Sequence, residues 1–131
     1  MVEPPQHQTE IVLAVRERYL ARVLMRGLSA PDRTVTRVTS GKAVLERLPS
    51  RVPHVLVVDL DLALMSGEEL CRRVQAQMPE RPFLTVVLAS GAEDQYGHFS
   101  QWFSQFRLLE KPISLNALNA LIEEHLTEAV E

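Results

Sequence analysis

The sequence predicts an α/β fold, a doubly wound five-stranded parallel sheet with helices on both faces. The first observation is that short apolar runs, typical of strands, alternate five times with segments of helical periodicity along the 131 residues. The second is that the runs at 11–15, 54–59 and 83–89 are apolar almost throughout, as in parallel strands buried on both sides. Because connections between parallel strands are right-handed, the helices form two layers that enclose the sheet.

The first five elements each have a local signal. Residues 11–15 (IVLAV) predict the first strand, and apolar residues at helical spacing predict a helix over 18–28. After a turn that contains proline, residues 34–38 (TVTRV) predict a second strand. Residues 41–49 predict a short helix that a proline stops, and residues 54–59 (HVLVVD) carry the strongest strand signal in the chain.

The second half of the chain continues the alternation. Residues 67–77 predict a helix that ends before a proline, and residues 83–89 (FLTVVLA) predict the fourth strand. A helix is expected over 92–105, followed by a fifth strand over 106–110 (FRLLE). The last helix is expected over 115–128, with a serine as its N-cap and aliphatic side chains on its inner face.

Length and composition indicate one globular domain. We expect it to span residues 10–128, with a disordered tail at 1–9 and a short tail at 129–131. The net charge of −3 gives no basic surface for nucleic acid, and no apolar run approaches the roughly 20 residues that cross a bilayer. The one cysteine, Cys71, suits a reducing compartment, and the N-terminus lacks the pattern of a secretory signal. We therefore expect a cytoplasmic protein that binds neither nucleic acid nor membranes.

Chemically active side chains lie at the carboxyl ends of the predicted strands. In chain order they are Arg16, Glu17, Asp59, Ser90 and Lys111. Doubly wound folds place their site at this edge of the sheet. The combination suits phosphoryl transfer, in which a carboxylate attacks phosphorus while an ammonium group offsets the charge and a hydroxyl donates to a phosphoryl oxygen.

These residues give the chain a resemblance to the receiver domains of two-component response regulators, and the likeness extends from residue 11 to about residue 128. In that family the phosphoacceptor aspartate ends the third strand and a glycine follows eight residues later, as Asp59 and Gly67 do. The family's Ser or Thr after the fourth strand corresponds to Ser90, and its Lys-Pro after the fifth corresponds to Lys111-Pro112. Each motif alone is weak, but their order on five alternating units is specific.

The resemblance implies a flavodoxin-like sheet in the strand order 2-1-3-4-5 and a signalling phosphoprotein rather than an enzyme. It implies that Asp59 accepts a phosphoryl group and that Ser90 and Lys111 bind it. It also implies a magnesium ion held by Glu17, by Asp59 and by the backbone carbonyl of Asp61. The implied partners are a histidine kinase or phosphotransfer protein and an unknown downstream protein, with a homodimer as a further option. We expect a single-domain receiver with no attached output domain.

The chain departs from the family at three positions. Receivers usually carry two adjacent acids after the first strand, but here Arg16 replaces the first acid and Glu17 takes the second position. If the register slips by one residue, no acid pair remains. Ala63 stands where a proline is usual, and Leu108 stands where the family has its switch aromatic. Trp102, in the helix expected over 92–105, is a candidate for the output surface.

Two other functions remain open. One is a degenerate, phosphorylation-independent interaction module, in which Arg16 pairs with Asp59 or Glu17 and replaces the metal ion. The other is a haloacid-dehalogenase-like phosphatase, whose first motif also places Asp-x-Asp after a strand, as in Asp59-Leu60-Asp61. That motif normally lies on the first strand, and here no acidic cluster follows at a later strand end to complete its magnesium site. The sequence therefore favours the receiver over the phosphatase.

Overall fold

The computed structural model describes residues 8–62, 64–79, 83–91 and 105–130, which form five strands and four helices. The strands are β1 (Thr9–Ala14), β2 (Arg33–Val38), β3 (Val55–Asp59), β4 (Leu84–Ala89) and β5 (Gln105–Glu110). The helices are α1 (Arg18–Leu28), α2 (Gly41–Arg47), α3 (Gly67–Gln77) and α4 (Leu115–Val130). None of these described helices combines the length and the apolar character that a membrane crossing requires.

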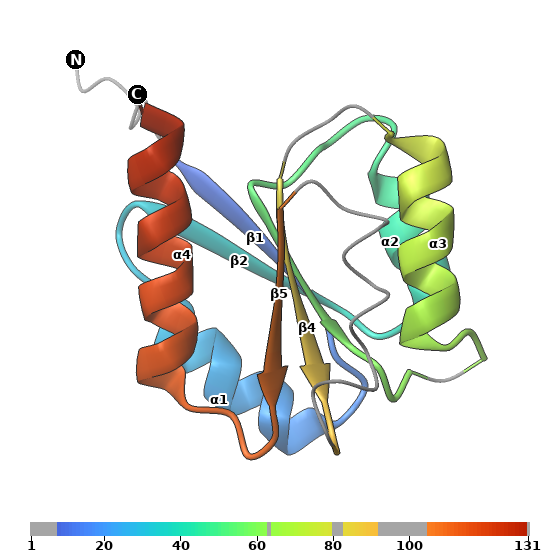
Figure 1. Cartoon of the computed structure of the whole chain (residues 1–131), viewed down its shortest axis with the longest axis horizontal. Helices are drawn as coiled ribbons and strands as arrows, with labels where there is room; N and C mark the ends of the chain where they lie inside the picture. The colour runs from blue at the N-terminus through green and yellow to red at the C-terminus, as the bar shows by residue number, and fades with distance from the viewer. Residues whose placement is uncertain (1–7, 63, 80–82, 92–104, 131) are drawn as a thin grey trace.

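The five strands form one sheet in the order β2-β1-β3-β4-β5, and every neighbouring pair is parallel. Figure 1 shows α1 and α4 on one side of this sheet and α2 and α3 on the other. The doubly wound fold, the strand order 2-1-3-4-5 and the two helical layers predicted from the sequence are therefore confirmed.

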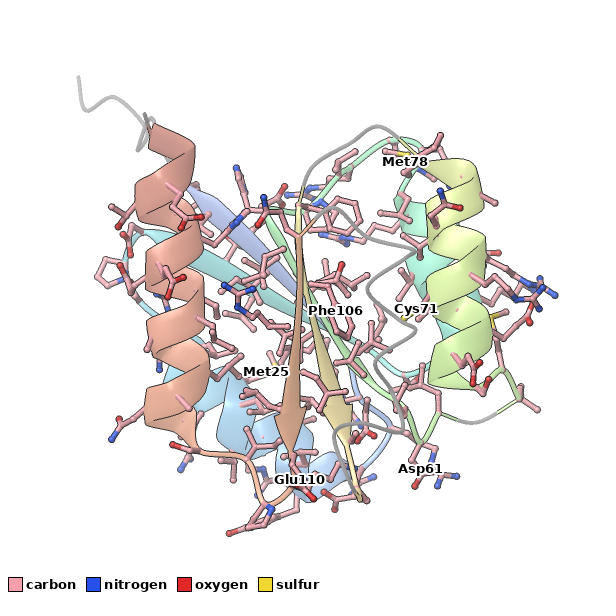
Figure 2. All side chains as sticks on the ribbon, in the orientation of Figure 1. Met25, Asp61, Cys71, Met78, Phe106 and Glu110 are labelled. Carbon is pink, nitrogen blue, oxygen red and sulfur yellow. The ribbon has the colours of Figure 1, made fainter. Side chains whose placement is uncertain are left out.

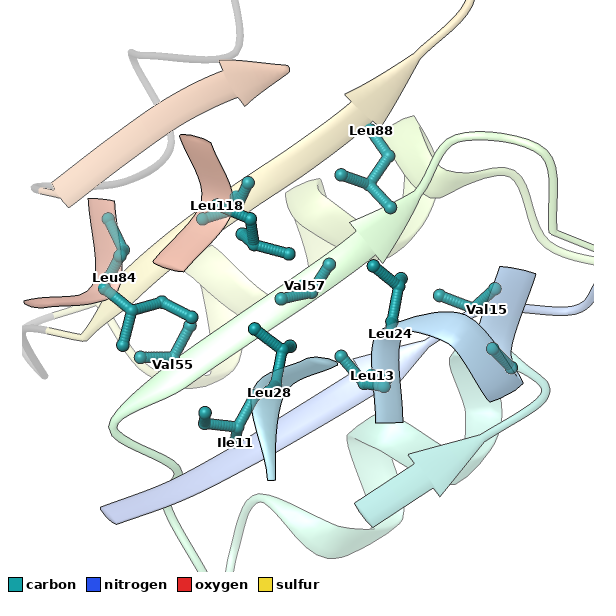
Figure 3. Close-up of a cluster of buried hydrophobic side chains, with 13 residues drawn as sticks. Ile11, Leu13, Val15, Leu24, Leu28, Val55, Val57, Leu84, Leu88 and Leu118 are labelled. Atoms are coloured by element: carbon teal, nitrogen blue, oxygen red, sulfur yellow. The ribbon is translucent and has the colours of Figure 1, made fainter. Parts of the chain in front are cut away.

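The core between the sheet and the layer of α1 and α4 follows from the two-residue period of the strands. Because successive side chains of a strand point to opposite faces, every second apolar residue reaches this layer. Its fully buried members include Ile11, Leu13, Leu24, Val57 and Leu118 (Figure 3). Burying one such side chain contributes roughly 1.5–3 kcal/mol, so this layer fixes how β1, β3 and α4 pack together.

The alternate residues of the same strands build a second core against α2 and α3. Val12 and Leu56 face this layer, where they join Leu70 and Cys71 of α3. Burial, with a smaller effect from the charge of Glu68, raises the pKa of the Cys71 thiol to about 12. The thiol therefore stays protonated and packs as a small apolar group.

The ends of several elements differ from those expected. β1 begins at Thr9, which is buried, and Gln8 donates a hydrogen bond to a side chain of β2, so structure begins inside the segment expected as a tail. Gln105 was expected at the end of a helix but lies in β5, because its backbone pairs with β4. The rest of that expected helix, 92–104, lies outside the described residues, and α4 continues to Val130 instead of ending at residue 128.

A close backbone contact shapes the loop between β3 and α3. The Gly67 amide donates to the Leu60 carbonyl at 3.2 Å. A Cβ atom at Gly67 would lie 2.6 Å from the Leu60 Cα, which is closer than side-chain carbons approach backbone. A glycine therefore lets α3 begin directly against this loop and holds Leu60 beside Asp59 at the edge of the sheet.

Replacing Gly67 with alanine is expected to lower the free energy of unfolding by about 1–3 kcal/mol, because the added methyl group forces the backbone at Leu60 to move. The matched control is Gly27→Ala in α1, where the nearest atoms are terminal carbons of the Leu115 side chain at 2.5 and 2.6 Å. That side chain can rotate away, and alanine favours a helix over glycine by roughly 1 kcal/mol. Urea denaturation measures both variants, and equal losses at the two positions would contradict this explanation.

Candidate functional site

An ion pair between Asp59 and Lys111 lies at the carboxyl edge of the sheet. Asp59 is the last residue of β3, and Lys111 follows β5, so the lysine side chain reaches across the end of β4. Its Nζ donates to both carboxylate oxygens of Asp59, at 3.0 Å to Oδ1 and 2.9 Å to Oδ2. The Asp59 side chain is 3% exposed and that of Lys111 is 28% exposed. A carboxylate withdrawn from water to this extent needs a partner, and Lys111 supplies it.

Backbone hydrogen bonds position both members of the pair. The Lys111 amide donates to the Ala89 carbonyl of β4 at 2.8 Å, and the peptide bond between Lys111 and Pro112 is cis. The Asp61 amide donates to Oδ1 of Asp59 at 2.9 Å. Oδ1 therefore accepts from an amide as well as from the ammonium group, which orients the carboxylate and directs Oδ2 toward the ammonium.

The ion pair lies in an open pocket of about 330 Å³. The pocket is lined by Asp59, Leu60, Asp61, Leu88, Ser90 and Lys111. Figure 2 shows Asp61 at the end of the sheet toward which the arrows of β4 and β5 point. The structure thus brings Asp59, Ser90 and Lys111 together around one pocket, as the sequence predicted.

Arg16 pairs with Asp61, and not with Asp59 or Glu17 as the interaction-module hypothesis expected. Its Nη2 lies 3.4 Å from Oδ2 of Asp61, and the two side chains are 53% and 77% exposed. A pair this exposed contributes at most about 1 kcal/mol. The expectation was wrong because Lys111 already engages both oxygens of Asp59 and because Glu17 is engaged by its own helix.

Glu17 is the N-cap of α1. Its carboxylate accepts hydrogen bonds from the amides of Tyr19 at 3.0 Å and Leu20 at 2.5 Å. These bonds, first that from Leu20, hold the pKa of Glu17 below its ordinary value, and the charges of Lys111 and Arg37 lower this pKa further. Glu17 therefore lies within the electrostatic reach of Lys111, but its carboxylate serves the first turn of α1.

Arg37, in β2, positions the loop after β1 and was not singled out from the sequence. Its Nε donates to the Val15 carbonyl at 3.1 Å, and its Nη2 donates to the Arg16 carbonyl at 2.8 Å. These bonds tie the loop to the edge strand and fix the point at which Arg16 leaves the sheet. No sequence signal marks this role, because only the pairing of β1 with β2 brings the two segments together.

The carboxylates at this edge do not fit a magnesium ion as they stand. Mg²⁺ requires oxygen donors in nearly octahedral geometry. The carboxylate of Glu17 accepts amide hydrogens of α1, and both oxygens of Asp59 accept from Lys111. Arg16, next to Glu17 in the chain, brings a positive charge that opposes a metal cation there. Within the described part of the chain, no group of three or more His, Cys, Asp or Glu side chains is placed to hold a metal ion.

Three other positions singled out from the sequence lie elsewhere. Leu108, which the resemblance matched to the family's switch aromatic, is partly buried in β5, where it pairs with Val87 of β4. Trp102 and Ala63 lie outside the described residues. The role of Trp102 at an output surface therefore stays a prediction.

The parallel sheet in this strand order, with an aspartate paired to a lysine at its carboxyl edge, defines a receiver-type α/β signalling domain. The chain belongs to the response regulator receiver domain family, because the model of that family matches residues 12–123. Receiver domains of two-component systems act with histidine kinases or phosphotransfer proteins, and they typically bind magnesium.

Two transcription regulators show the likeness in sequence. The DNA-binding transcriptional regulator NtrC of Escherichia coli (strain K12) is 28% identical over 109 residues, which cover 83% of this chain and 23% of the regulator. The transcriptional regulatory protein CutR of Streptomyces coelicolor is 34% identical over 82 residues, which cover 62% of this chain and 37% of CutR. The chain thus spans between about a quarter and two fifths of the length of these curated relatives.

Solved structures show the likeness in fold. The receiver domain of the Francisella response regulator 1452 aligns with a TM-score of 0.81 at 16% identity, covering 92% of this chain and 98% of that one. A sensor protein from Polaromonas sp. JS666 aligns with a TM-score of 0.78 at 25% identity, covering 95% of this chain and 98% of that one. At 16% identity the first of these comparisons supports the fold alone.

Replacing Lys111 with methionine removes the charge while keeping an apolar stem. The change is expected to lower the free energy of unfolding by about 1–3 kcal/mol, because it leaves the Asp59 carboxylate buried without its ammonium partner. In an Asp59→Asn background, the same replacement of Lys111 is expected to lower the free energy of unfolding much less. Urea denaturation of the two single variants and the double variant measures the coupling, and simple additivity would show that the two side chains do not interact.

The lowered pKa of Glu17 predicts how the stability of α1 depends on pH. Because folding lowers this pKa, the cap stabilises the fold fully above the pKa of unfolded glutamate, near pH 4, and this stabilisation is lost as pH falls through the folded pKa. Glu17→Gln is therefore expected to melt at a lower temperature than the wild type at pH 7, and the difference should shrink in acid. Thermal denaturation between pH 7 and pH 3 measures this difference in melting temperature. A difference independent of pH would contradict the stabilising role of the charged Glu17 cap.

Proposed function

We propose that the chain accepts a phosphoryl group on Asp59 from a histidine kinase or phosphotransfer protein and then signals through protein–protein contact. The observation that carries this proposal is the buried Asp59 carboxylate, held by Lys111 in an open pocket that Ser90 also lines. A carboxylate at the switch point of a doubly wound sheet, oriented by an amide and an ammonium group, suits nucleophilic attack on phosphorus.

The chemistry in this proposal is a single transfer. Oδ2 of Asp59 attacks the phosphorus atom of the donor, the bond from phosphorus to the donor breaks, and an acyl phosphate forms on the protein. The Asp61 amide keeps Oδ1 in place, while Lys111 moves its hydrogen bond from Oδ2 to a phosphoryl oxygen. The Ser90 hydroxyl donates to another phosphoryl oxygen. The protein takes up one phosphoryl group and acts as a signalling protein rather than as an enzyme.

Phosphorylation changes the ends of three neighbouring strands. The phosphoryl group adds roughly −1.5 to −2 charges at the end of β3, and its ligands Ser90 and Lys111 follow β4 and β5. Binding of the new oxygens therefore favours an arrangement in which these strand ends draw toward β3. Couplings of this kind amount to about 1–3 kcal/mol, enough for a downstream protein to distinguish the two states.

The test is phosphorylation by acetyl phosphate in a buffer that contains magnesium, followed by intact-mass measurement and peptide mapping. One phosphoryl group is expected on Asp59 of the wild type and none on Asp59→Asn. Asp61→Asn serves as the matched control, because it alters the neighbouring exposed carboxylate and leaves the nucleophile in place. An adduct that persists in Asp59→Asn would contradict the assignment of the phosphoacceptor.

The interaction module is the second candidate, and the position of Arg16 favours it. A cation in place of the first acid, paired with Asp61, gives the pocket a charge arrangement that needs no phosphoryl group to be balanced. This function predicts no adduct with acetyl phosphate and a partner that binds Asp59→Asn as well as the wild type. The phosphatase alternative instead predicts repeated release of free phosphate, so one set of reactions separates the three functions.

A further inference from the structure

Arg16 is placed to change partners at the rim of the pocket. Its Nη2 contacts Oδ2 of Asp61 at 3.4 Å, and both side chains are largely exposed. Such a pair contributes at most about 1 kcal/mol, so a stronger anion nearby can replace Asp61 as the partner of Arg16. Because Asp61 lines the pocket beside Asp59, a phosphoryl group on Asp59 would be an anion of this kind.

The backbone of Arg16 is held at this rim independently of its side chain. The guanidinium of Arg37 donates to the Arg16 carbonyl at 2.8 Å and to the Val15 carbonyl at 3.1 Å. Val15 itself is fully buried in the core. The backbone position of Arg16 is therefore fixed. Its guanidinium group is exposed and can change its rotamer to pair with a different anion.

The charges at the rim call for a second cation once Asp59 carries a phosphoryl group. The pocket and its surroundings then hold the phosphoryl charge of roughly −1.5 to −2 together with the carboxylates of Asp61 and Glu17. Lys111 offsets one charge. A guanidinium group can bind two phosphoryl oxygens in a bidentate geometry, which an ammonium group cannot do. The Glu17 carboxylate caps α1, and the neighbouring Arg16 is a cation, so this edge offers magnesium a poor set of oxygen ligands.

We propose that Arg16 supplies this second positive charge, so that phosphorylation of Asp59 proceeds without a divalent cation. The inference rests on the proposed phosphoacceptor function of Asp59. With an acyl phosphate as donor, Oδ2 of Asp59 forms the bond to phosphorus, the bond from phosphorus to the acyl oxygen breaks, and the carboxylate leaves with the electron pair. Arg16 releases Asp61 and binds two phosphoryl oxygens, while Lys111 binds the third.

The test compares the rate of adduct formation from acetyl phosphate in EDTA with the rate in excess magnesium. The wild type is expected to react at similar rates, within about twofold, in both buffers. Arg16→Asp is expected to react about 10- to 100-fold more slowly than the wild type in EDTA, which corresponds to about 1.4–2.7 kcal/mol in the activation free energy. Magnesium should restore the rate of Arg16→Asp, because the new aspartate carboxylate next to Glu17 supplies a further oxygen ligand.

Two controls accompany this test. Arg18→Asp makes the same change of net charge at an exposed position in the first turn of α1, outside the residues that line the pocket, and should behave as the wild type. Calorimetric titration with magnesium alone, without a phosphodonor, should detect tighter binding to Arg16→Asp than to the wild type. Thermal melts verify that the variants are folded.

The outcomes separate this inference from the function on which it rests. Two results together support the role of Arg16. The wild type forms the adduct at equal rates in both buffers, and Arg16→Asp is slow in EDTA but not in magnesium. An adduct that forms on the wild type only with magnesium overturns this role and leaves Asp59 as the phosphoacceptor. A rate in EDTA that Arg16→Asp does not change also overturns it. No adduct in either buffer overturns both the inference and the proposed function.

Discussion

The arrangement of the site depends on one constraint, which is that parallel strands bring their carboxyl ends to the same edge of a sheet. Asp59 ends β3 and Lys111 follows β5, and β4 lies between them. The hydrogen bond from the Lys111 amide to Ala89 sets where the lysine side chain begins, and its ammonium group then spans β4 to reach Asp59. This ion pair offsets the cost of burying the Asp59 carboxylate, which is only 3% exposed.

The same edge shows how local backbone demands compete with ligand binding. The resemblance to receivers led us to expect Glu17 as a metal ligand. However, α1 begins at the next residue, and its first turn has amides that need acceptors. The carboxylate satisfies the amides of Tyr19 and Leu20, which lowers its pKa. The start of one helix thus takes up oxygens that a magnesium site would use. This capping role, together with the cation Arg16 next to Glu17 in the chain, leaves the pocket with few free carboxylate oxygens for a metal ion.

Much of the fold follows from strong local patterns, and the exceptions have identifiable causes. The uninterrupted apolar runs of β3 and β4 predict central strands, and they are buried along their whole length. Gln105 was expected in a helix, but its pairing with Leu84 places it in β5, because hydrogen bonds between strands outweigh a local propensity. Thr9 extends β1 in the same way through its pairing with Arg33. Pairing of this kind joins residues far apart in the sequence and leaves no local signal.

The features of the site also separate into those that follow from the sequence and those that depend on tertiary contacts. The sequence by itself determined which chemical groups follow each strand, and the parallel order of the strands then required Asp59, Ser90 and Lys111 to share one edge. Only the tertiary structure decided that Arg16 pairs with Asp61 and that Arg37 holds the loop between β1 and α1. The physical reason is that strand ends are placed by the hydrogen-bond register of the whole sheet. The partners of long side chains depend instead on which charges and amides lie within a few ångströms after folding.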